Sequence, residues 1–431
     1  AAPQLGRPGL PGCGLAIPLG HFNNHGEAAG GATRHSHPTQ THHTAVTTGT
    51  YNTSPTGLLT AWQALHALNT GTVTAVELVR QCHACIDTIN PVVRAMVTED
   101  RSATLGSDLA GSIRIPAAYC GVAGLKATEG RLSISGHIPP LPGAPRTVWH
   151  MLSLGVLARC VGDLALGFDA LLSPNTPATP PATLGRPLRV AWWDDFGGLP
   201  LCPRTRTALD ATVYALSQAG ATVQRVCPAN FDAPTAWSAF GHVAGAEIGL
   251  GLPTMSRWVA ATAGKLLGPL MAANGMPLSR AITQGMALGM RRYNDGLNQR
   301  ASLMAALDSF LTEWDVWLCP VAATTAYPAC PPGRWPASPW LTVGQRRVPR
   351  LEATLGMTVP FSLTGHPVVS LPAGVYDGLP VGLQVVGARW AEHRLLACAT
   401  AMESVISETQ AHLPASHRQH ALHAAGRPET S

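Results

Sequence analysis

A serine hydroxyl set among small residues is the feature of this 431-residue chain that could do chemistry. Ser112 follows Ala110 and Gly111, and Gly106 lies shortly before them. Residues this small let the main chain fold so tightly that consecutive backbone N–H groups converge beside the hydroxyl. Such a cup of donors is what the oxyanion of an acyl-transfer reaction needs, so the spacing indicates nucleophilic serine chemistry.

Two charged residues flank this serine. Asp108 and Arg114 are spaced so that a charge-assisted pair can form across the loop, which would hold the backbone donors still before a substrate arrives. We therefore expect both side chains to support the site rather than to react. An ordinary Gly-Ser turn is the alternative for Ser112, but it leaves the residues that follow the serine unexplained.

The elements that must position this segment are predicted from residue periodicity. Residues 188–193 favour a buried strand, 203–219 a helix stopped by Gly220, and 221–226 a further strand. This order with short joints is the unit of a parallel sheet with right-handed crossovers. Residues 232–310 are predicted to be helical, and we expect Met255, Trp258, Met271 and Met286 within them to pack in the core rather than to line a pocket.

Other elements are predicted toward both ends of the chain. Helices are expected over residues 58–68 and 74–86, before the serine. Residues 315–320 favour a strand that ends at a proline.

The segment from Leu105 to Gly121, followed by Gly124-Leu125-Lys126-Ala127-Thr128 and Gly130-Arg131, resembles the nucleophile segment of the amidase signature family. Residues 153–159 match a later family motif, and residues 365–374 and 378–387 match the two closing strands of the family, which a final helix follows. The resemblance covers about residues 54–410. It implies an α/β fold in which a mixed β-sheet is sandwiched between helices.

The chemistry that this resemblance implies is hydrolysis of a carboxamide carbon–nitrogen bond through an acyl-enzyme on Ser112. The backbone of Leu109, Ala110 and Gly111, together with that of Ser112, would hold the oxyanion. Ala110 stands where the family commonly has glycine, which matters only if the position needs a positive φ. Serine acyl transfer needs neither a metal nor a nucleotide, so no metal site and no cofactor are expected.

A block of sequence that the family carries before the nucleophile is expected to be missing near residues 102–104. Family members have an upstream lysine that accepts the proton and a second serine in a Gly-Ser-rich loop. Of the 29 lysines and arginines, only Lys126 and Lys265 are lysines, and both follow Ser112. Arginine stays protonated and cannot replace the base, while His137 and His150 are histidines that in principle could.

Two alternatives to an active amidase therefore stay open. One is a catalytically impaired amidase-family pseudoenzyme or deletion product, whose sheet edges would be left unpaired. The other is the glutaminase-type subunit of a tRNA-dependent amidotransferase, which feeds ammonia to misacylated tRNA.

Composition limits the partners of the chain. A formal charge of +5 without a dense Lys/Arg block argues against direct nucleic-acid binding, and no apolar run is long enough for a membrane helix. The expected partner is a small-molecule amide, and the oligomeric state stays open. Ten cysteines without framework spacing and no visible secretory signal favour the cytoplasm.

The ends of the chain differ from the middle in composition. Residues 1–50 are rich in Gly, Thr and His and are predicted to be a disordered tail, residues 51–412 an amidase-like domain, and residues 413–431 a second tail. The histidines of the first tail favour a solvated segment over a loose metal site. Cys82-His83-Ala84-Cys85 has no second pair at zinc-finger spacing, so a structural role is expected.

Overall fold

The computed structural model describes residues 105–134, 137, 147–172, 184–328 and 339–411 of the chain. The helices predicted before residue 90, the Cys82–Cys85 pair, the missing block near residues 102–104 and both tails lie outside the described residues. The predicted domain boundaries near residues 50 and 412 therefore stay predictions.

The framework is an eight-stranded sheet with the order β1-β3-β2-β9-β10-β6-β4-β5. A separate two-stranded sheet pairs β7 with β8. The strands are β1 (Leu105–Asp108), β2 (Ala123–Lys126), β3 (Ser153–Ala158), β4 (Arg189–Trp192), β5 (Thr222–Arg225), β6 (Val316–Pro320), β7 (Trp340–Val343), β8 (Arg346–Pro349), β9 (Val368–Tyr376) and β10 (Leu379–Val386). Each predicted strand between residues 188 and 387 is present within a few residues of its expected limits.

The sheet is mixed, as the family resemblance implies. β4 pairs in parallel with both β5 and β6, and the predicted strand–helix–strand unit is confirmed by α5 (Pro203–Gln218) between β4 and β5. Pro203 begins this helix, and Gly220 follows its end with a φ of +88° that a residue with a side chain rarely adopts. The other pairs of the large sheet are antiparallel, and β1 lies at one end with β3 as its neighbour.

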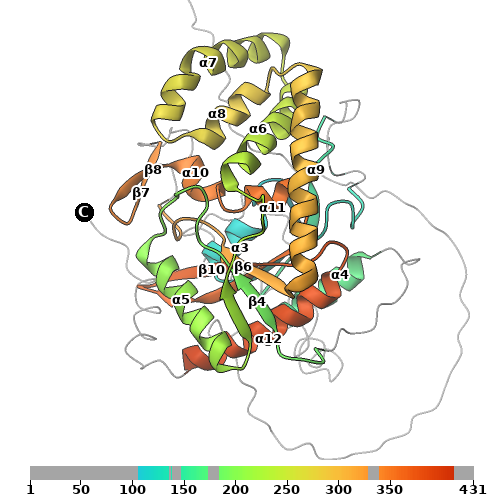
Figure 1. Cartoon of the computed structure of the whole chain (residues 1–431), viewed down its shortest axis with the longest axis vertical. Coiled ribbons are helices and arrows are strands. Elements are labelled where there is room, and N and C mark those ends of the chain that lie inside the picture. Colours follow the sequence, from blue (N-terminus) through green and yellow to red (C-terminus); the bar gives the residue numbers. More distant parts are fainter. Residues whose placement is uncertain (1–104, 135–136, 138–146, 173–183, 329–338, 412–431) are drawn as a thin grey trace, which may run out of the picture.

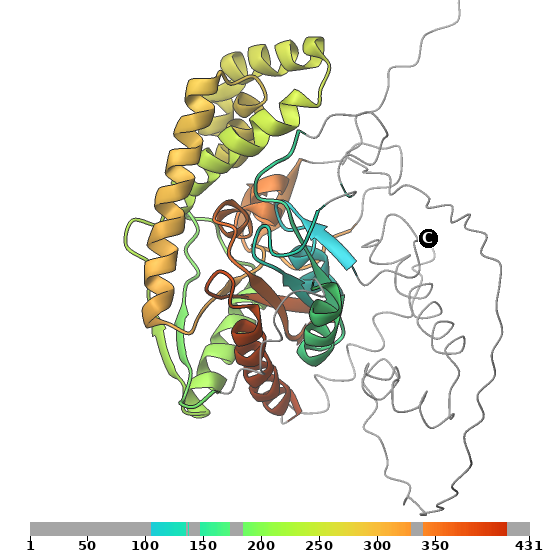
Figure 2. The same ribbon diagram turned by 90° about the vertical axis from the view of Figure 1, so that its right-hand side faces the viewer.

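Helices cover both faces of the sheet (Figure 1). α4 (Val161–Leu171), α5 and α12 (Glu392–Ala411) pack on one face with β2, β3, β9 and β10. α3 (Arg114–Cys120), α6 (Ala233–Leu250), α9 (Met290–Glu313) and α11 (Val359–Leu363) lie on the other side. Figure 2 shows the gold helix α9 running along the outside of this second layer. The sandwich predicted from the resemblance is confirmed.

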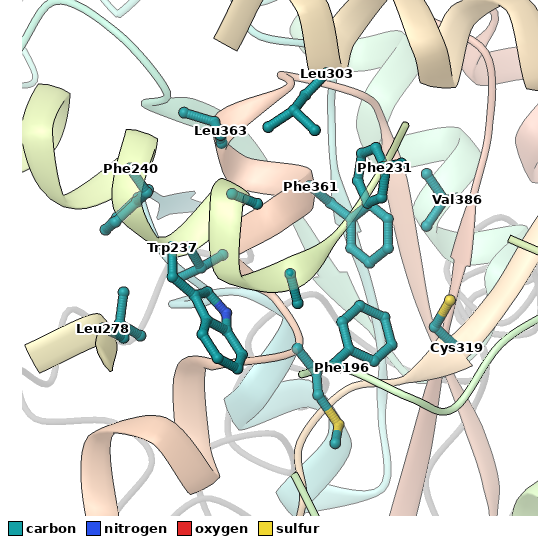
Figure 3. Packing of buried hydrophobic residues seen from close by; sticks show 14 of the residues in the cluster. Phe196, Phe231, Trp237, Phe240, Leu278, Leu303, Cys319, Phe361, Leu363 and Val386 are labelled. Atoms are coloured by element: carbon teal, nitrogen blue, oxygen red, sulfur yellow. The ribbon is translucent and has the colours of Figure 1, made fainter. Parts of the chain in front are cut away.

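The core on the α6 side is built from aromatic side chains (Figure 3). The Trp317 ring meets Phe231 and Phe361 edge to face, with ring centroids 5.4 Å apart in both pairs. Phe231 and Phe361 stack on each other with centroids 6.3 Å apart. Because such pairs favour defined geometries, they fix the start of α6 against β6 and α11.

One packing expectation is wrong. Met255 and Trp258 lie on α7 (Thr254–Ala273) with 70% and 65% of their surface exposed, so neither packs in the core. α7 lies at the outer end of the molecule, where α8 (Pro277–Gly285) packs against it (Figure 1). α10 (Arg350–Leu355) lies nearer the sheet and also packs on α8. Within the described ranges, no helix combines the length and apolar character needed to cross a lipid bilayer.

Candidate active site

The serine lies in a turn that joins β1 to α3. Gly111 is buried there with a φ of +139°, and a Cβ atom at this position would lie 2.5 Å from Ile115 Cδ1 and 2.7 Å from Thr358 Oγ1. The Ile115 N–H donates to the Gly111 carbonyl over 2.8 Å, and the Thr358 hydroxyl donates to the Ala110 carbonyl over 2.5 Å. These contacts fix the turn and allow only glycine at position 111.

Asp108 and Arg114 form a fully buried ion pair beneath this turn. Arg114 Nε and Nη2 donate to the two carboxylate oxygens over 3.0 and 2.9 Å. The backbone N–H of Ile113 donates to the same carboxylate over 3.2 Å. Burial raises the pKa of Asp108, but the charge and hydrogen bonds of Arg114 outweigh it, so the pKa lies below its ordinary value. The carboxylate is therefore ionised and holds the turn from below.

Arg114 also ties the turn to distant parts of the chain. Its Nη1 atom donates to the Thr358 carbonyl over 2.8 Å and to Gln384 Oε1 over 3.3 Å. Its Nη2 atom donates to Ser362 Oγ over 2.5 Å. Sequence reasoning missed Thr358, Ser362 and Gln384, because only the folded sheet brings them to Arg114. In the sequence, the one indication of a role for these three residues is that each is polar and lies within an apolar segment.

The arrangement leaves Ser112 accessible above this support. Ser112 is exposed, whereas Gly111 and Ile113 on either side are buried. Within the described part of the chain, the backbone N–H groups of Ala110, Gly111 and Ser112 donate to no acceptor. Ala110 does not have a positive φ, so alanine at this position strains nothing. Free amide donors beside an accessible hydroxyl are suited to a tetrahedral adduct on Ser112.

A buried lysine lies below the ion pair. Lys126 ends β2, and its Nζ atom donates to the Ala127 carbonyl over 3.2 Å and to Ser153 Oγ over 3.4 Å. Ser153 begins β3 and pairs with Asp108 across the sheet. Burial, and then repulsion by Arg114, lower the pKa of Lys126 to about 7. None of the hydrogen bonds between described residues joins this amine to Ser112.

We predict that Lys126→Met changes how stability depends on pH. The unfolded chain holds the lysine proton up to about pH 10.5, whereas the folded chain loses it near pH 7, so the wild type gains stability as pH rises between these values. The variant lacks this gain, which amounts to a few kcal/mol, roughly. Urea unfolding at about pH 6 and about pH 10 measures it. Lys265→Met, which removes an exposed lysine, is the matched control, and equal pH slopes for wild type and Lys126→Met would contradict the prediction.

The two histidines considered as bases lie in different surroundings. His150 Nδ1 contacts Glu247 Oε1 at 2.5 Å, and Tyr293 donates to the same oxygen over 2.9 Å. Burial raises the pKa of Glu247, but the hydrogen bonds from His150, from backbone N–H groups and from Tyr293 bring it below its ordinary value. Burial lowers the pKa of His137. Among the described residues, no hydrogen bond or ion pair joins either histidine to Ser112.

Gly111→Ala is predicted to destabilise the turn. The new methyl group would collide with Ile115 and Thr358 and would force alanine into a backbone conformation that favours glycine. We expect a loss of about 2–4 kcal/mol in the free energy of unfolding. Gly220→Ala is the matched control, since Gly220 also has a positive φ but no atom within 4 Å of a Cβ. Equal losses in both variants, measured by urea unfolding, would show that the turn does not pack as described.

Comparison with known proteins matches this site to a family. The Amidase family profile matches residues 100–396. A glutamyl-tRNA(Gln) amidotransferase subunit of Thermosynechococcus vestitus is 31% identical over 332 residues, 72% of this chain and 65% of the relative. The 1-carboxybiuret hydrolase subunit AtzE of a Pseudomonas species is 30% identical over 309 residues, 67% of this chain and 60% of the relative.

Solved structures agree with these relatives. An amidase crystal structure superposes with a TM-score of 0.52 at 27% identity, covering 70% of this chain and 62% of the other. A bacterial aryl acylamidase of the amidase signature family, at 21% identity and a TM-score of 0.51, shares the fold. The chain thus spans less than two thirds of the length of these curated relatives. Since the profile covers more than half of the chain, including the turn that carries Ser112, the chain belongs to the amidase family.

Proposed function

We propose that this protein hydrolyses the carbon–nitrogen bond of a small carboxamide through an acyl-enzyme on Ser112. The observation that carries the proposal is the turn itself, in which the buried Asp108–Arg114 pair holds backbone amides that have no acceptor among the described residues beside the exposed Ser112. The relative AtzE, a 1-carboxybiuret hydrolase subunit, supports the same class of reaction.

The chemistry follows from the geometry of the turn. The Ser112 hydroxyl oxygen attacks the amide carbonyl carbon, its proton passes through solvent to the amide nitrogen, and the carbonyl oxygen takes up the negative charge. The N–H groups of Leu109, Ala110, Gly111 and Ser112 donate to that oxygen, which is the largest stabilisation such a site provides. The amine leaves with a proton, and water then releases the acid from the serine ester. Asp108 and Arg114 act by holding the donors in place.

Acyl-enzyme trapping tests this proposal. With p-nitroacetanilide as substrate, we expect release of p-nitroaniline, and with added hydroxylamine we expect acetohydroxamate, because the amine intercepts the serine ester. The same assay on Ser112→Ala is the control. This variant should form no acetohydroxamate if the ester forms on Ser112. Release of p-nitroaniline with no hydroxamate would contradict an acyl-enzyme.

An impaired enzyme is the second candidate, and one observation favours it. In the described part of the chain, Ser112 has no basic side chain within hydrogen-bond distance, and no lysine precedes it in the sequence. Without a base, the rate would fall to roughly 10³–10⁴-fold over water, the acceleration that remains in serine proteases without their triad members. Resequencing the gene around codons 100–106 would show whether a lysine-containing block has been lost.

A glutaminase-type subunit is the third candidate. It is favoured by the relatives that belong to glutamyl-tRNA(Gln) amidotransferases. This function predicts that the protein releases ammonia from glutamine faster than it cleaves p-nitroacetanilide, which a glutamate dehydrogenase-coupled assay measures. The reverse preference supports the amidase.

A further inference from the structure

The outward side of α7 carries large apolar side chains that do not pack against the rest of the molecule. Six of them are each more than half exposed, namely Met255, Trp258, Val259, Leu266, Leu267 and Leu270. These six side chains form the α7 face. Apolar side chains exposed singly are ordinary on a protein surface, so what matters is whether the six form one patch.

Helix periodicity places the α7 face in one stripe. Val259, Leu266 and Leu270 follow its first side chain by 4, 11 and 15 residues, and each spacing is close to a whole number of helical turns. Trp258 and Leu267 lie on either side of this stripe. At about 1.5 Å per residue, the stripe is roughly 22 Å long. A contiguous apolar patch of this kind marks a surface that contacts another molecule.

Glycines form the inward side of α7. Gly264 and Gly268 are buried against Gln284 of α8, whose Nε2 atom donates to the Gly264 carbonyl over 3.4 Å. A Cβ atom at Gly268 would lie 3.1 Å from the same Nε2 atom. The helix therefore packs on the molecule through its smallest residues and turns its largest apolar side chains outward. A helix that only completes a core has the opposite arrangement.

The charge around the α7 face has one sign. Residues 248–294 contain no aspartate and no glutamate, although the chain has 24 of these residues. The basic residues of this stretch are Arg257, Lys265, Arg280, Arg291 and Arg292. No ion pair between described residues involves any of the five. Their positive charge can therefore attract an anionic partner.

The positive charge lies at the same end of the molecule as the α7 face. Lys265 is exposed on α7 itself, and Arg291 and Arg292 are exposed in the first turn of α9. α9 begins near the end of α6, because a Cβ atom at Gly249 would collide with the backbone of Met286. Figures 1 and 2 both show α7 and the start of α9 at the end of the molecule away from the large sheet. One partner surface can therefore contact the apolar and the positive groups together.

An anionic bilayer surface fits this combination better than a second copy of the chain. A helix that lies in the membrane interface has leucine and tryptophan on its buried side and lysine or arginine around it. Tryptophan suits the interface because its ring is apolar and its N–H is polar, and lysine reaches water past an apolar stem. Two copies joined through their α7 faces would bring like charges together, which repulsion opposes.

We propose that the α7 face binds the surface of a bilayer that contains anionic lipids. The apolar side chains enter the interface, and Lys265, Arg291 and Arg292 contact the lipid headgroups. The helix lies along the bilayer surface and does not cross it. This membrane contact goes beyond the amidase reaction and does not depend on Ser112.

Vesicle co-sedimentation of the full chain tests the proposal. The vesicles consist of phosphatidylcholine alone or of phosphatidylcholine with about 30 mol% phosphatidylserine. Each basic residue near an anionic surface raises the affinity about five-fold, so we expect binding to the phosphatidylserine vesicles to be at least about ten-fold tighter. Equal binding to both vesicles, or no binding to either, would overturn the proposal.

Substitutions of leucine locate the contact. Leu266→Ser with Leu270→Ser is expected to weaken vesicle binding at least about ten-fold, because two apolar side chains no longer enter the interface. Leu166→Ser with Leu171→Ser is the matched control, since both leucines are exposed on α4, which packs on the large sheet far from α7. Thermal melts check that each variant is folded. Equal loss of binding in the two double variants would overturn the assignment to α7.

Substitutions of basic residues separate local charge from net charge. Lys265→Gln with Arg291→Gln is expected to weaken binding to the phosphatidylserine vesicles at least about ten-fold and to leave binding to phosphatidylcholine alone unchanged. Arg186→Gln with Arg204→Gln changes the net charge equally but lies outside residues 248–294, so wild-type binding is expected. Equal losses in these two variants would contradict a contact at α7.

Sedimentation velocity without vesicles tests the other occupant of this face. We expect Leu266→Ser with Leu270→Ser to sediment like the wild type. A wild-type dimer that this double substitution dissociates would assign the α7 face to a second copy of the chain and would overturn the proposal.

Discussion

Arg114→Met is expected to lower the free energy of unfolding by about 3–5 kcal/mol. The substitution leaves the Asp108 carboxylate buried without its guanidinium partner and removes the hydrogen bonds to Thr358 and Ser362. An uncompensated buried charge is far more costly than a lost surface pair. Urea unfolding at neutral pH, followed by circular dichroism, measures the change.

An ion pair with a half-exposed arginine, whose carboxylate keeps a second arginine partner, provides the control for this experiment. Arg394 contacts Asp315 at 2.5 Å but is 47% exposed, and Arg186 also pairs with Asp315. Arg394→Met is therefore expected to cost less than about 1 kcal/mol. Arg114→Lys keeps a charge but loses the planar fork, so its loss should lie between the two. If Arg114→Met were no worse than Arg394→Met, the buried pair would not support the turn.

Ser112→Ala is expected to reduce amide hydrolysis by at least about 10³-fold without unfolding the protein. The hydroxyl is exposed and donates no hydrogen bond to another described residue, so its removal leaves the packing unchanged. The rate falls because the attacking oxygen is gone, while the backbone donors remain. Initial rates with p-nitroacetanilide and thermal melts of both proteins measure the two effects.

Ser256→Ala is the matched control for the nucleophile. Ser256 is also exposed but lies on α7, at the outer end of the molecule. We expect wild-type rates from this variant. Activity that persists in Ser112→Ala would mean that another group carries out the reaction.

Much of the sheet could be predicted from the sequence because residues close in sequence determine where its strands begin and end. Pro203 and Gly220 bracket α5, apolar runs mark β4 and β6, and the family resemblance marks β9 and β10. The resemblance around Ser112 likewise rests on contiguous residues, and so does the spacing of Asp108 and Arg114. Features of this kind depend only on neighbouring residues, so they can be predicted without knowledge of the fold.

Long-range contacts could not be predicted in the same way. Arg114 meets Thr358 and Gln384 across 244 and 270 residues, and no local pattern encodes that separation. Lys126 looked like one residue of a motif, and only the fold shows it buried beneath Asp108 and Arg114. Apolar residues on a helix usually pack against a partner, which predicts Met255 and Trp258 in the core, but the face of α7 that carries them is exposed.

Labelling of the intact protein with a fluorophosphonate tests the central claim most directly, since the reagent forms a tetrahedral adduct on a serine held beside oxyanion donors. Peptide mapping by mass spectrometry should find the phosphonyl group on Ser112, and the label should be absent from Ser112→Ala. A label on a different serine, or a folded protein that stays unlabelled, would contradict the proposal that the turn from Leu109 to Ser112 is built to hold such an adduct.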